Sequence, residues 1–313
     1  ILVNNEYTCD AYISPHLSNF NERIILNNKE VSTNKLYNTL KYVKKINNKK
    51  PITFFEITTA AAFILFQQSK SDFLILETGL GGRLDATNII NPLISVITNI
   101  SYDHTDILGN SLEMIASEKA GIFKKNSTII VGERNDSVDE VFINKANEVS
   151  SKITFVPDYN DQKQYSSVNY LNTNIKTAIY TCKALNIENV DNNSIITGIS
   201  NINKNCHLIG RWSILSENPR VIFDAAHNLA GFKIISSQLE KVRYDKLHVI
   251  LSFVKGKNIK ELIAELPFDS KIYYTSLNME RGMTLNELIQ NVGRNIIFDD
   301  NAKRLLKAVK KDC

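Results

Sequence analysis

The segment Glu77-Thr-Gly-Leu-Gly-Gly-Arg-Leu-Asp-Ala-Thr-Asn88 constrains the fold of this chain more than any other stretch. It directly follows an apolar run, Phe73-Leu-Ile-Leu76, which predicts a buried strand of a parallel sheet. Glycines after such a strand let the backbone approach an anion or a flat ligand closely. Because ligands bind at the carboxyl ends of strands in open α/β sheets, this segment predicts a binding site there.

The first polar residue after the apolar run is Glu77, whose carboxylate is a natural ligand for Mg²⁺, since a hard cation prefers oxygen. Taken alone, a GxGG string is more often an ordinary strand-to-loop turn with a surface ion pair. The motifs elsewhere in the chain therefore decide between the two interpretations.

The composition indicates a globular chain of 313 residues, which is long enough for two domains. A net charge of only +4, without a dense basic block, argues against a nucleic-acid surface. No CxxC pair occurs among the cysteines, so neither a zinc site nor a disulfide framework is predicted. The four cysteines are Cys9, Cys182, Cys206 and Cys313.

No apolar run approaches the roughly 18 residues that a membrane span requires, so no membrane partner is expected. No signal peptide is visible, and the expected location is the cytoplasm. Because the first residue is Ile1 rather than Met, we expect that the true N-terminus lies upstream.

Strand-like and helix-like segments alternate along the chain, which predicts an α/β fold with mostly parallel sheets covered by helices. The expected strands are Leu74–Leu76, Ile94–Thr98, Thr128–Val131, Ile153–Val156, Val221–Phe223, His248–Phe253, Lys271–Thr275 and Ile296–Phe298. The expected helices are Asn34–Lys45, Thr53–Gln68, Ser111–Lys119, Gly231–Val242, Ile259–Leu266, Leu285–Val292 and Asn301–Lys310. Around Asn205–Arg211 an Asn-rich helical stretch gives way to a new β-rich unit, so we place a domain boundary between residues 207 and 208.

Polar groups also follow the second expected strand, in Asp103-His104. A neutral imidazole can ligate a divalent metal, and an adjacent carboxylate can orient it. Further along, Lys119 precedes Gly121 at an expected helix end, where a lysine usually complements the helix dipole. An isolated Asp-His pair is likewise most often a surface feature, so each residue alone favours the simpler interpretation.

In the second unit, the strand that ends at Phe223 leads into Asp224-Ala-Ala-His227-Asn228. Asp224 can hydrogen-bond a ribose, and His227 can donate to a phosphate, although Asp224 and Asn228 are also ordinary helix caps. Upstream, Arg211 can stack on a base or pair with a phosphate.

Taken together, the order and spacing of six motifs resemble the folylpolyglutamate synthase/dihydrofolate synthase family, relatives of the Mur peptide ligases. The motifs are YISPHL, FNERI, TFFE, ETGLGGRLDATN, DHTDILGNSLEMIASEKAGIFK, and GRW followed by FDAAHN. They span nearly the whole chain. The resemblance implies an ATPase-type domain of mostly parallel sheet over residues 1–207 and a smaller Rossmann-like α/β domain over residues 208–313.

The resemblance also implies a role for individual residues, with ATP and Mg²⁺ as cofactors. The metal ligands would be Ser14, Glu77 and His104. The position that is carbamylated in the family would be Lys119. Contacts with ATP would come from Arg211, Asp224, His227 and, through an HQxxN-like element, Asn172. The pterin or pteroate pocket would be lined by Thr53, Phe54, Phe55, Glu56, Leu84, Asp85 and Ala86.

The chain departs from the family pattern in two places. Val168-Asn169 stands where the HQxxN element has His-Gln, and no GTNGKGS-type P-loop occurs in the 313 residues. A P-loop supplies the backbone nest and the lysine that hold the β- and γ-phosphates, so we expect this chain alone to be inactive. We also expect that the family's closing strand lies beyond Cys313.

The function implied is the ATP-dependent addition of L-glutamate to folates, to dihydropteroate or to both, through an acyl phosphate, by a monomer. The second domain would close on the first about a hinge near Asn205–Arg211. Three alternatives remain open: a non-catalytic remnant that keeps the fold, a Mur-type ligase acting on cell-wall precursors, and a generic nucleotide-binding module. The TFFE and SPHL motifs disfavour the cell-wall ligase.

Overall fold

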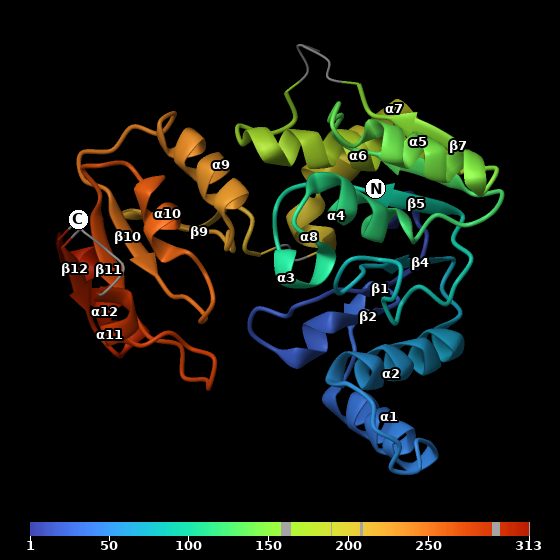
Figure 1. Ribbon diagram of the computed structural model, residues 1–313, viewed down its shortest axis with the longest axis horizontal. Helices are drawn as coiled ribbons and strands as arrows, with labels where there is room; N and C mark the ends of the chain where they lie inside the picture. Colours follow the sequence, from blue (N-terminus) through green and yellow to red (C-terminus); the bar gives the residue numbers. More distant parts are fainter. Residues whose placement is uncertain (158–163, 189, 207–208, 290–294, 313) are drawn as a thin grey trace. The chain divides into compact units, whose positions relative to one another are not determined.

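The computed structural model describes residues 1–157, 164–188, 190–206, 209–289 and 295–312 (Figure 1). The chain divides into two compact units, Ile1–Ile209 and Gly210–Cys313. The boundary expected from the sequence, at residues 207 and 208, lies outside the described residues. Each unit mixes helices with parallel strand pairs, as the alternation of segments predicts. No helix in the described part of the chain has the length and apolar character needed to cross a membrane.

The first sheet of unit 1 has four strands in the order β3-β2-β1-β4. Its strands are β1 (Cys9–Tyr12), β2 (Ile24–Leu26), β3 (Lys29–Glu30) and β4 (Phe73–Leu76), and two short 3₁₀ turns are η1 (Val3–Asn5) and η2 (Phe20–Arg23). β1 pairs antiparallel with β2 and parallel with β4. The two helices beside this sheet, α1 (Thr33–Ile46) and α2 (Phe54–Ser69), bury a core that includes Tyr12, Leu36 and Leu65.

Capping residues fix where both helices begin. The Ser32 hydroxyl accepts the Lys35 backbone N–H at the start of α1. At the start of α2, Thr53 and Glu56 form a reciprocal capping box, in which each side chain accepts the other's backbone N–H. α2 ends at Lys70, which adopts the left-handed conformation with φ of 58°.

Strand β4 is parallel, as predicted, but the prediction that it is buried is wrong. Leu74 is 40% exposed and Ile75 is 54% exposed. The reason is its place in the sheet: β4 pairs with β1 on one side, and within the described residues no strand pairs with its other edge. An apolar run predicts a strand, but it does not predict how many other strands pair with it.

The second sheet of unit 1 consists of β5 (Ile94–Ile97), β6 (Thr128–Val131) and β7 (Lys152–Phe155), all parallel. α4 and α5 pack against it around Phe123 and Phe142, while α6 lies against β5 and β6. The helices of this part are α3 (Thr105–Leu108), α4 (Leu112–Ala120), α5 (Asp139–Glu148), α6 (Asn169–Leu185), α7 (Asn192–Ser200) and α8 (Ile202–Cys206).

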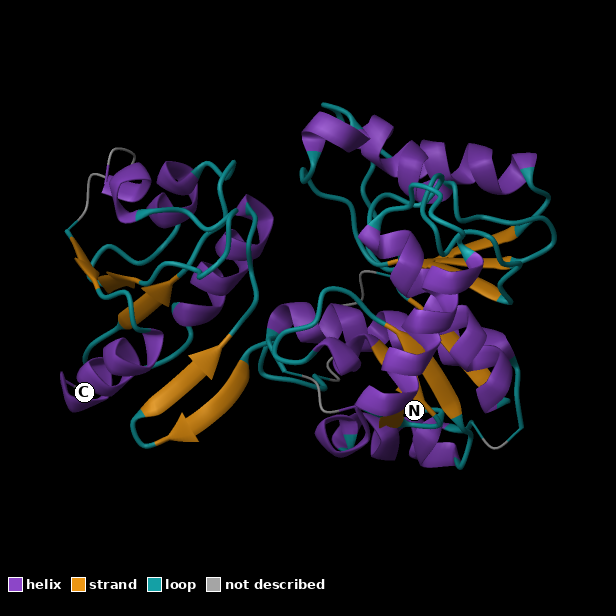
Figure 2. Ribbon diagram, turned by 90° about the horizontal axis from the view of Figure 1, so that it is seen from below, coloured by secondary structure: helices purple, strands orange, loops and turns teal. Residues whose placement is uncertain are grey.

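Unit 2 contains an antiparallel hairpin, β8 (Ser213–Glu217) and β9 (Arg220–Phe223), and a separate parallel sheet, as Figure 2 shows. The parallel sheet has the order β10-β11-β12, formed by β10 (His248–Leu251), β11 (Lys271–Tyr274) and β12 (Ile296–Phe298). Its helices are α9 (Leu229–Leu239), α10 (Ile259–Ala264), α11 (Leu285–Ile289) and α12 (Ala302–Asp312). Buried side chains such as Phe253, Ile272 and Leu288 form the core.

A buried carboxylate fastens the first sheet of unit 1. Asp10 of β1 is only 2% exposed, and its Oδ1 accepts three hydrogen bonds. The donors are the Asn27 backbone N–H at 2.8 Å, the Ser69 hydroxyl at 2.9 Å and the Ser71 hydroxyl at 2.7 Å. The carboxylate therefore joins β1 to the turn after β2 and to the end of α2.

We predict that Asp10→Ala lowers the free energy of unfolding of unit 1 by about 3 kcal/mol, because three partly buried donors lose the buried carboxylate that accepts from all of them. The measurement is urea denaturation followed by circular dichroism. The control is Asp136→Ala, which removes an exposed carboxylate and is expected to change stability by less than about 0.5 kcal/mol. Equal midpoints for both variants would contradict this role of Asp10.

Candidate active site

The glycine-rich loop that follows β4 lies directly on the last turn of α4. A Cβ atom on Gly82 would stand 2.8 Å from the Lys119 carbonyl oxygen and 2.9 Å from that of Glu118. The Arg83 backbone N–H donates to the Glu118 carbonyl at 2.9 Å, and the Arg83 guanidinium donates twice to the Glu118 carboxylate. Only glycine fits at position 82 while these contacts are made.

Gly121, just after α4, completes this backbone contact from the other side. Its φ of −59° is ordinary, so the left-handed turn that usually explains a glycine at a helix end does not apply here. A Cβ atom at this position would collide with the backbone of Arg83. The Asn88 side-chain amide then donates to the carbonyl oxygens of both Arg83 and Gly121.

Asp85 determines the shape of the glycine-rich loop. Its carboxylate accepts the backbone N–H groups of Gly79 at 2.8 Å, Leu80 at 3.0 Å and Thr87 at 2.9 Å, and also the Thr87 hydroxyl. A carboxylate with these contacts holds the loop in one conformation. The adjacent Leu84 side chain is 80% exposed.

The start of α2 brings the TFFE segment to this loop. The Phe55 ring lies where a side chain on Gly79 would be, and it also packs on Tyr12. The Phe54 ring instead makes an edge-to-face contact with Phe20. Hydrogen bonds from the Thr53 backbone and hydroxyl lower the pKa of Glu56, so this carboxylate serves first as a helix cap.

Ser14 and Glu77 meet at the carboxyl ends of β1 and β4. The parallel register aligns Tyr12 with Leu76, and the Ser14 backbone N–H donates to Glu77 Oε2 at 2.7 Å. Glu77 is exposed, so its carboxylate lies next to solvent, and Ser14, whose backbone it contacts, carries a hydroxyl as a second oxygen donor. This oxygen-donor pair fits Mg²⁺, which prefers one or two carboxylates and keeps several waters.

His104 begins α3, and its backbone is left-handed with φ of 48°. Its imidazole Nε2 lies 3.9 Å from Asp103 Oδ1. α3 approaches the glycine-rich loop because Leu108 packs where a side chain on Gly81 would be. No cluster of three or more His, Cys, Asp or Glu side chains that could hold a metal ion occurs in the part of the chain that the structure describes.

Lys119 lies on the α4 turn that the glycine-rich loop covers. Burial lowers the pKa of the Lys119 ammonium, and the nearby Asp103 carboxylate partly opposes this effect. A lysine with a lowered pKa is more often neutral and therefore more nucleophilic than a surface lysine. Lys119 is half-buried, so it is not the fully exposed surface charge that the residue taken alone favoured.

In unit 2, the loops that begin β8 and end β9 hold the predicted nucleotide residues together. The Asp224 carboxylate accepts the backbone N–H groups of Trp212 at 2.7 Å and Ala226 at 2.9 Å. Arg211 donates to the Gly210 carbonyl, and His227 Nδ1 lies 3.1 Å from the Ala225 carbonyl. The antiparallel register of the hairpin, with Ser213 opposite Phe223, brings these loops side by side.

Comparison with known proteins identifies the family. Residues 23–206 match the Mur ligase middle domain. The chain is 31% identical over 320 residues to the Escherichia coli dihydrofolate synthase/folylpolyglutamate synthase, an alignment that covers 97% of this chain and 74% of that protein. It belongs to the dihydrofolate synthase/folylpolyglutamate synthase family. Members of this family are ATP-dependent ligases, and the resemblance inferred from the six motifs is confirmed.

Solved structures of family members have the same fold. The E. coli FolC structure in complex with ADP superimposes with a TM-score of 0.88 at 30% identity, and the match covers 100% of this chain and 78% of that one. A Yersinia pestis enzyme complexed with AMPPNP and a Mn ion gives a TM-score of 0.87 at 26% identity. The mixed α/β fold with parallel sheets is therefore confirmed.

The structure also points to a residue that the sequence left without a role. Arg23 is only 8% exposed, its Nε donates to His16 Nδ1 at 2.8 Å, and its guanidinium lies over the Phe20 and Phe54 rings. Within the described residues it has no carboxylate partner. The FNERI motif contains this arginine, but the sequence alone does not show that its side chain is buried.

Asn172 is placed at the start of α6, where its amide is occupied by the backbone. Its Oδ1 accepts the N–H groups of Tyr165 and Ser166, and its Nδ2 donates to the carbonyls of Ser166 and Val168. These contacts hold the turn before α6.

We predict that Lys119→Met changes the pH dependence of stability. Because the pKa of Lys119 is lower in the folded state than its ordinary value of 10.5, the unfolded chain binds more protons between the two values, and wild-type stability rises with pH through that window. At pH near 7 the variant should be more stable than the wild type, because methionine carries no charge that folding must desolvate. This difference should shrink as the pH approaches 10.5, because only the stability of the wild type rises with pH. Urea midpoints measured across this range test the prediction.

The control is Lys125→Met, which removes an exposed lysine from the segment between α4 and β6. Its stability difference from the wild type should not depend on pH over this range. Parallel profiles for Lys119→Met and the wild type would show that Lys119 is not desolvated.

Proposed function

We propose that this chain carries the cation-binding and pterin-facing parts of an ATP-dependent ligase that adds L-glutamate to dihydropteroate, to folates or to both. The contact between the Ser14 backbone N–H and Glu77 carries the proposal, because it fixes a carboxylate at the start of the glycine-rich loop. The same loop lies on the α4 turn that contains Lys119. Relatives support it: E. coli FolC has been solved with DHPP and ADP, and a bifunctional relative with Mn, AMPPNP and L-glutamate.

In this proposal Ser14, Glu77 and His104 hold Mg²⁺. When bound, the ion neutralises charge on the phosphates of ATP. The Ser14 backbone N–H keeps the Glu77 carboxylate in place, and the Asp103 carboxylate accepts the His104 backbone N–H, which fixes the backbone from which the imidazole projects.

The reaction requires no protein nucleophile. The carboxylate of the substrate attacks the γ-phosphorus of ATP, the bond from that phosphorus to the bridging oxygen breaks, and ADP leaves with that electron pair. The neutral amine of glutamate then attacks the carbonyl of the acyl phosphate and gives up one proton to the solvent. The bond from the carbonyl carbon to the phosphate oxygen breaks, and inorganic phosphate leaves with that electron pair as the amide forms. As an ammonium, Lys119 would stabilise the negative charge that develops at the transferring phosphoryl group. In a carbamylated form it would be an anion and would act instead as an oxygen ligand for the cation.

The pterin ring would lie on the apolar face formed by Phe55 and the exposed Leu84, next to Ala86. Asp85 holds the loop, and Thr53 and Glu56 fix the start of α2. Arg23 is the cation that we propose for a carboxylate of the substrate, because it is buried against the Phe54 ring and has no acidic partner among the residues that the structure describes.

In unit 2, Arg211, Asp224 and His227 would contact ATP, with Asp224 at the ribose. For Asn172 we retain a nucleotide contact as a proposal, although its amide holds the turn before α6. The second candidate function is a non-catalytic family member that keeps the fold.

We predict that Glu77→Gln lowers kcat/KM for glutamate-dependent ADP formation by at least about 100-fold, because an amide is a poorer ligand for a hard cation than a carboxylate. The protein is expressed from its complete reading frame and assayed with ATP, dihydropteroate and L-glutamate. The circular dichroism spectrum should stay unchanged.

Glu140→Gln on α5 serves as the matched control and should keep wild-type turnover, since Glu140 is exposed and lies outside the loop cluster. Undiminished turnover of Glu77→Gln would refute the metal-ligand role. If the wild-type protein forms no ADP with either dihydropteroate or tetrahydrofolate, the non-catalytic alternative is favoured.

A further inference from the structure

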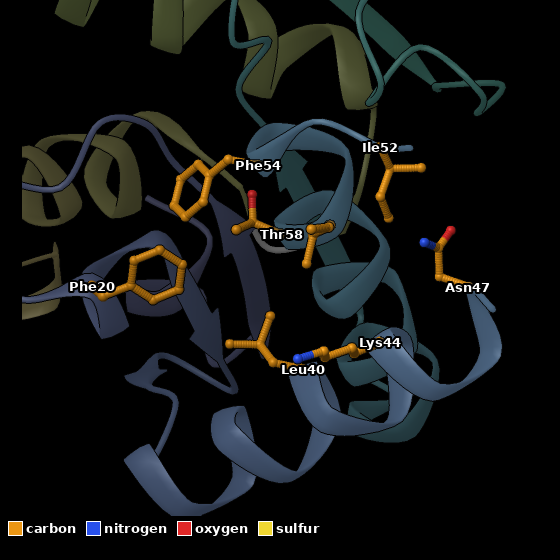
Figure 3. Close-up of a pocket in the computed structure, with 8 residues that line it drawn as sticks. Phe20, Leu40, Lys44, Asn47, Ile52, Phe54 and Thr58 are labelled. Atoms are coloured by element: carbon orange, nitrogen blue, oxygen red, sulfur yellow. The ribbon is translucent and has the colours of Figure 1, made fainter. Parts of the chain in front are cut away.

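Unit 1 contains a cavity of about 430 Å³ between α1, α2 and η2, which is separate from the glycine-rich loop (Figure 3). Sites for small molecules fall in this size range. The residues that line it are Phe20, Leu40, Lys44, Asn47, Ile52, Phe54, Ile57 and Thr58. None of them is acidic, and Lys44 is the one charged side chain among them.

The two phenylalanines of the TFFE motif serve different surfaces. Phe55 packs against Gly79 and Tyr12, on the side of the glycine-rich loop. Phe54 faces the cavity, where its ring centroid is 5.7 Å from that of Phe20 at an interplanar angle of 74°. A molecule bound in the cavity would therefore contact Phe54 and Phe20 without touching the loop after β4.

The polar wall groups beside the aromatic pair are already satisfied. The Thr58 hydroxyl donates to the Phe55 carbonyl at 3.0 Å and lies 2.7 Å from the Tyr12 hydroxyl, while the Asn47 amide donates to the Lys50 carbonyl. The surface offered to a ligand is therefore mostly aromatic and aliphatic. Such a surface favours a flat apolar group, because its burial removes apolar area from water.

Lys44 supplies charge at one end of this surface. In Figure 3 its ammonium group lies beside Leu40. Within the described residues it has no ion-pair or hydrogen-bond partner. A cation at the end of α1 also complements the helix dipole, but that effect does not require it to line a cavity. Lys44 is exposed, and its ammonium at the edge of this mostly apolar surface is complementary to a ligand with a carboxylate on an aromatic ring.

We propose that the α1–α2 cavity binds a flat aromatic monocarboxylate of one or two rings. Its rings pack against Phe20, Phe54 and Ile57, and its carboxylate pairs with Lys44. Arg23 lies over the Phe20 and Phe54 rings, with its guanidinium 5.6 Å from each centroid, and so holds both rings in place as a preformed wall.

The test is titration of the 313-residue chain with 2-naphthoate by isothermal calorimetry, with neither nucleotide nor metal present. We expect a dissociation constant of about 0.1 mM, which is ordinary for a ligand of this size. The neutral analogue 2-naphthalenemethanol should bind at least about fivefold more weakly, because it cannot pair with the ammonium.

Two variants and a matched control make the test specific. Lys44→Gln should weaken 2-naphthoate binding about fivefold and leave the neutral analogue unchanged. Lys45→Gln, which removes the adjacent exposed lysine of α1, should have no effect. Ile52→Trp fills the cavity from its rim and should abolish binding while the thermal midpoint is kept.

The proposal is overturned if 2-naphthoate does not bind to the wild type at about 2 mM. It is overturned too if Lys44→Gln and Ile52→Trp bind 2-naphthoate as tightly as the wild type does. It is also overturned if Lys45→Gln and Lys44→Gln lose the same affinity, since that would indicate general attraction to a basic helix. Because the measurement needs no ligase activity, either outcome is independent of the proposed function.

Discussion

The close approach of Gly82 to the last turn of α4 is the contact on which the candidate site depends. With no side chain at Gly82 or Gly121, the loop after β4 rests on the backbone of Glu118 and Lys119, and the Arg83 N–H finds an acceptor there. Two segments that are more than thirty residues apart in the sequence are thereby joined. A methyl group at either glycine would have to displace backbone atoms, which cannot move as a flexible side chain can.

This contact links the two chemically important neighbourhoods of unit 1. On one side, the loop begins at Glu77, which the register of β1 and β4 sets beside Ser14. On the other side, α4 carries Lys119 into a desolvated position near Asp103. An ATP-dependent ligase requires charge stabilisation and positioning more than a protein nucleophile, and both follow from groups held by backbone contacts. Family membership and this arrangement therefore support the same chemistry.

The sequence predicted elements well where one local signal was sufficient, as at β6 (Thr128–Val131) and at the capping box of Thr53 and Glu56. It missed β1 to β3, because these strands are only two to four residues long and too short for a periodic pattern. Pairing defines them: β1 pairs with the distant β4, and β2 pairs with its neighbours β1 and β3. Tertiary neighbours decide the exposure of Ile75 and the burial of Arg23. They also decide that the Phe54 ring contacts Phe20, whereas the Phe55 ring contacts Gly79. Gly121 was predicted as a helix end, but its real reason, proximity to Arg83, is not a local property.

The most direct test of the central contact is amide hydrogen exchange of Arg83, measured by NMR in the wild type and in Gly82→Ala. The 2.9 Å hydrogen bond from the Arg83 N–H to the Glu118 carbonyl predicts protection in the wild type. In Gly82→Ala we expect this amide to exchange at least about tenfold faster, while the amide of Ile130 in β6 keeps its protection. An Arg83 amide that exchanges like a free loop in the wild type, or at the same rate in Gly82→Ala, would contradict the account.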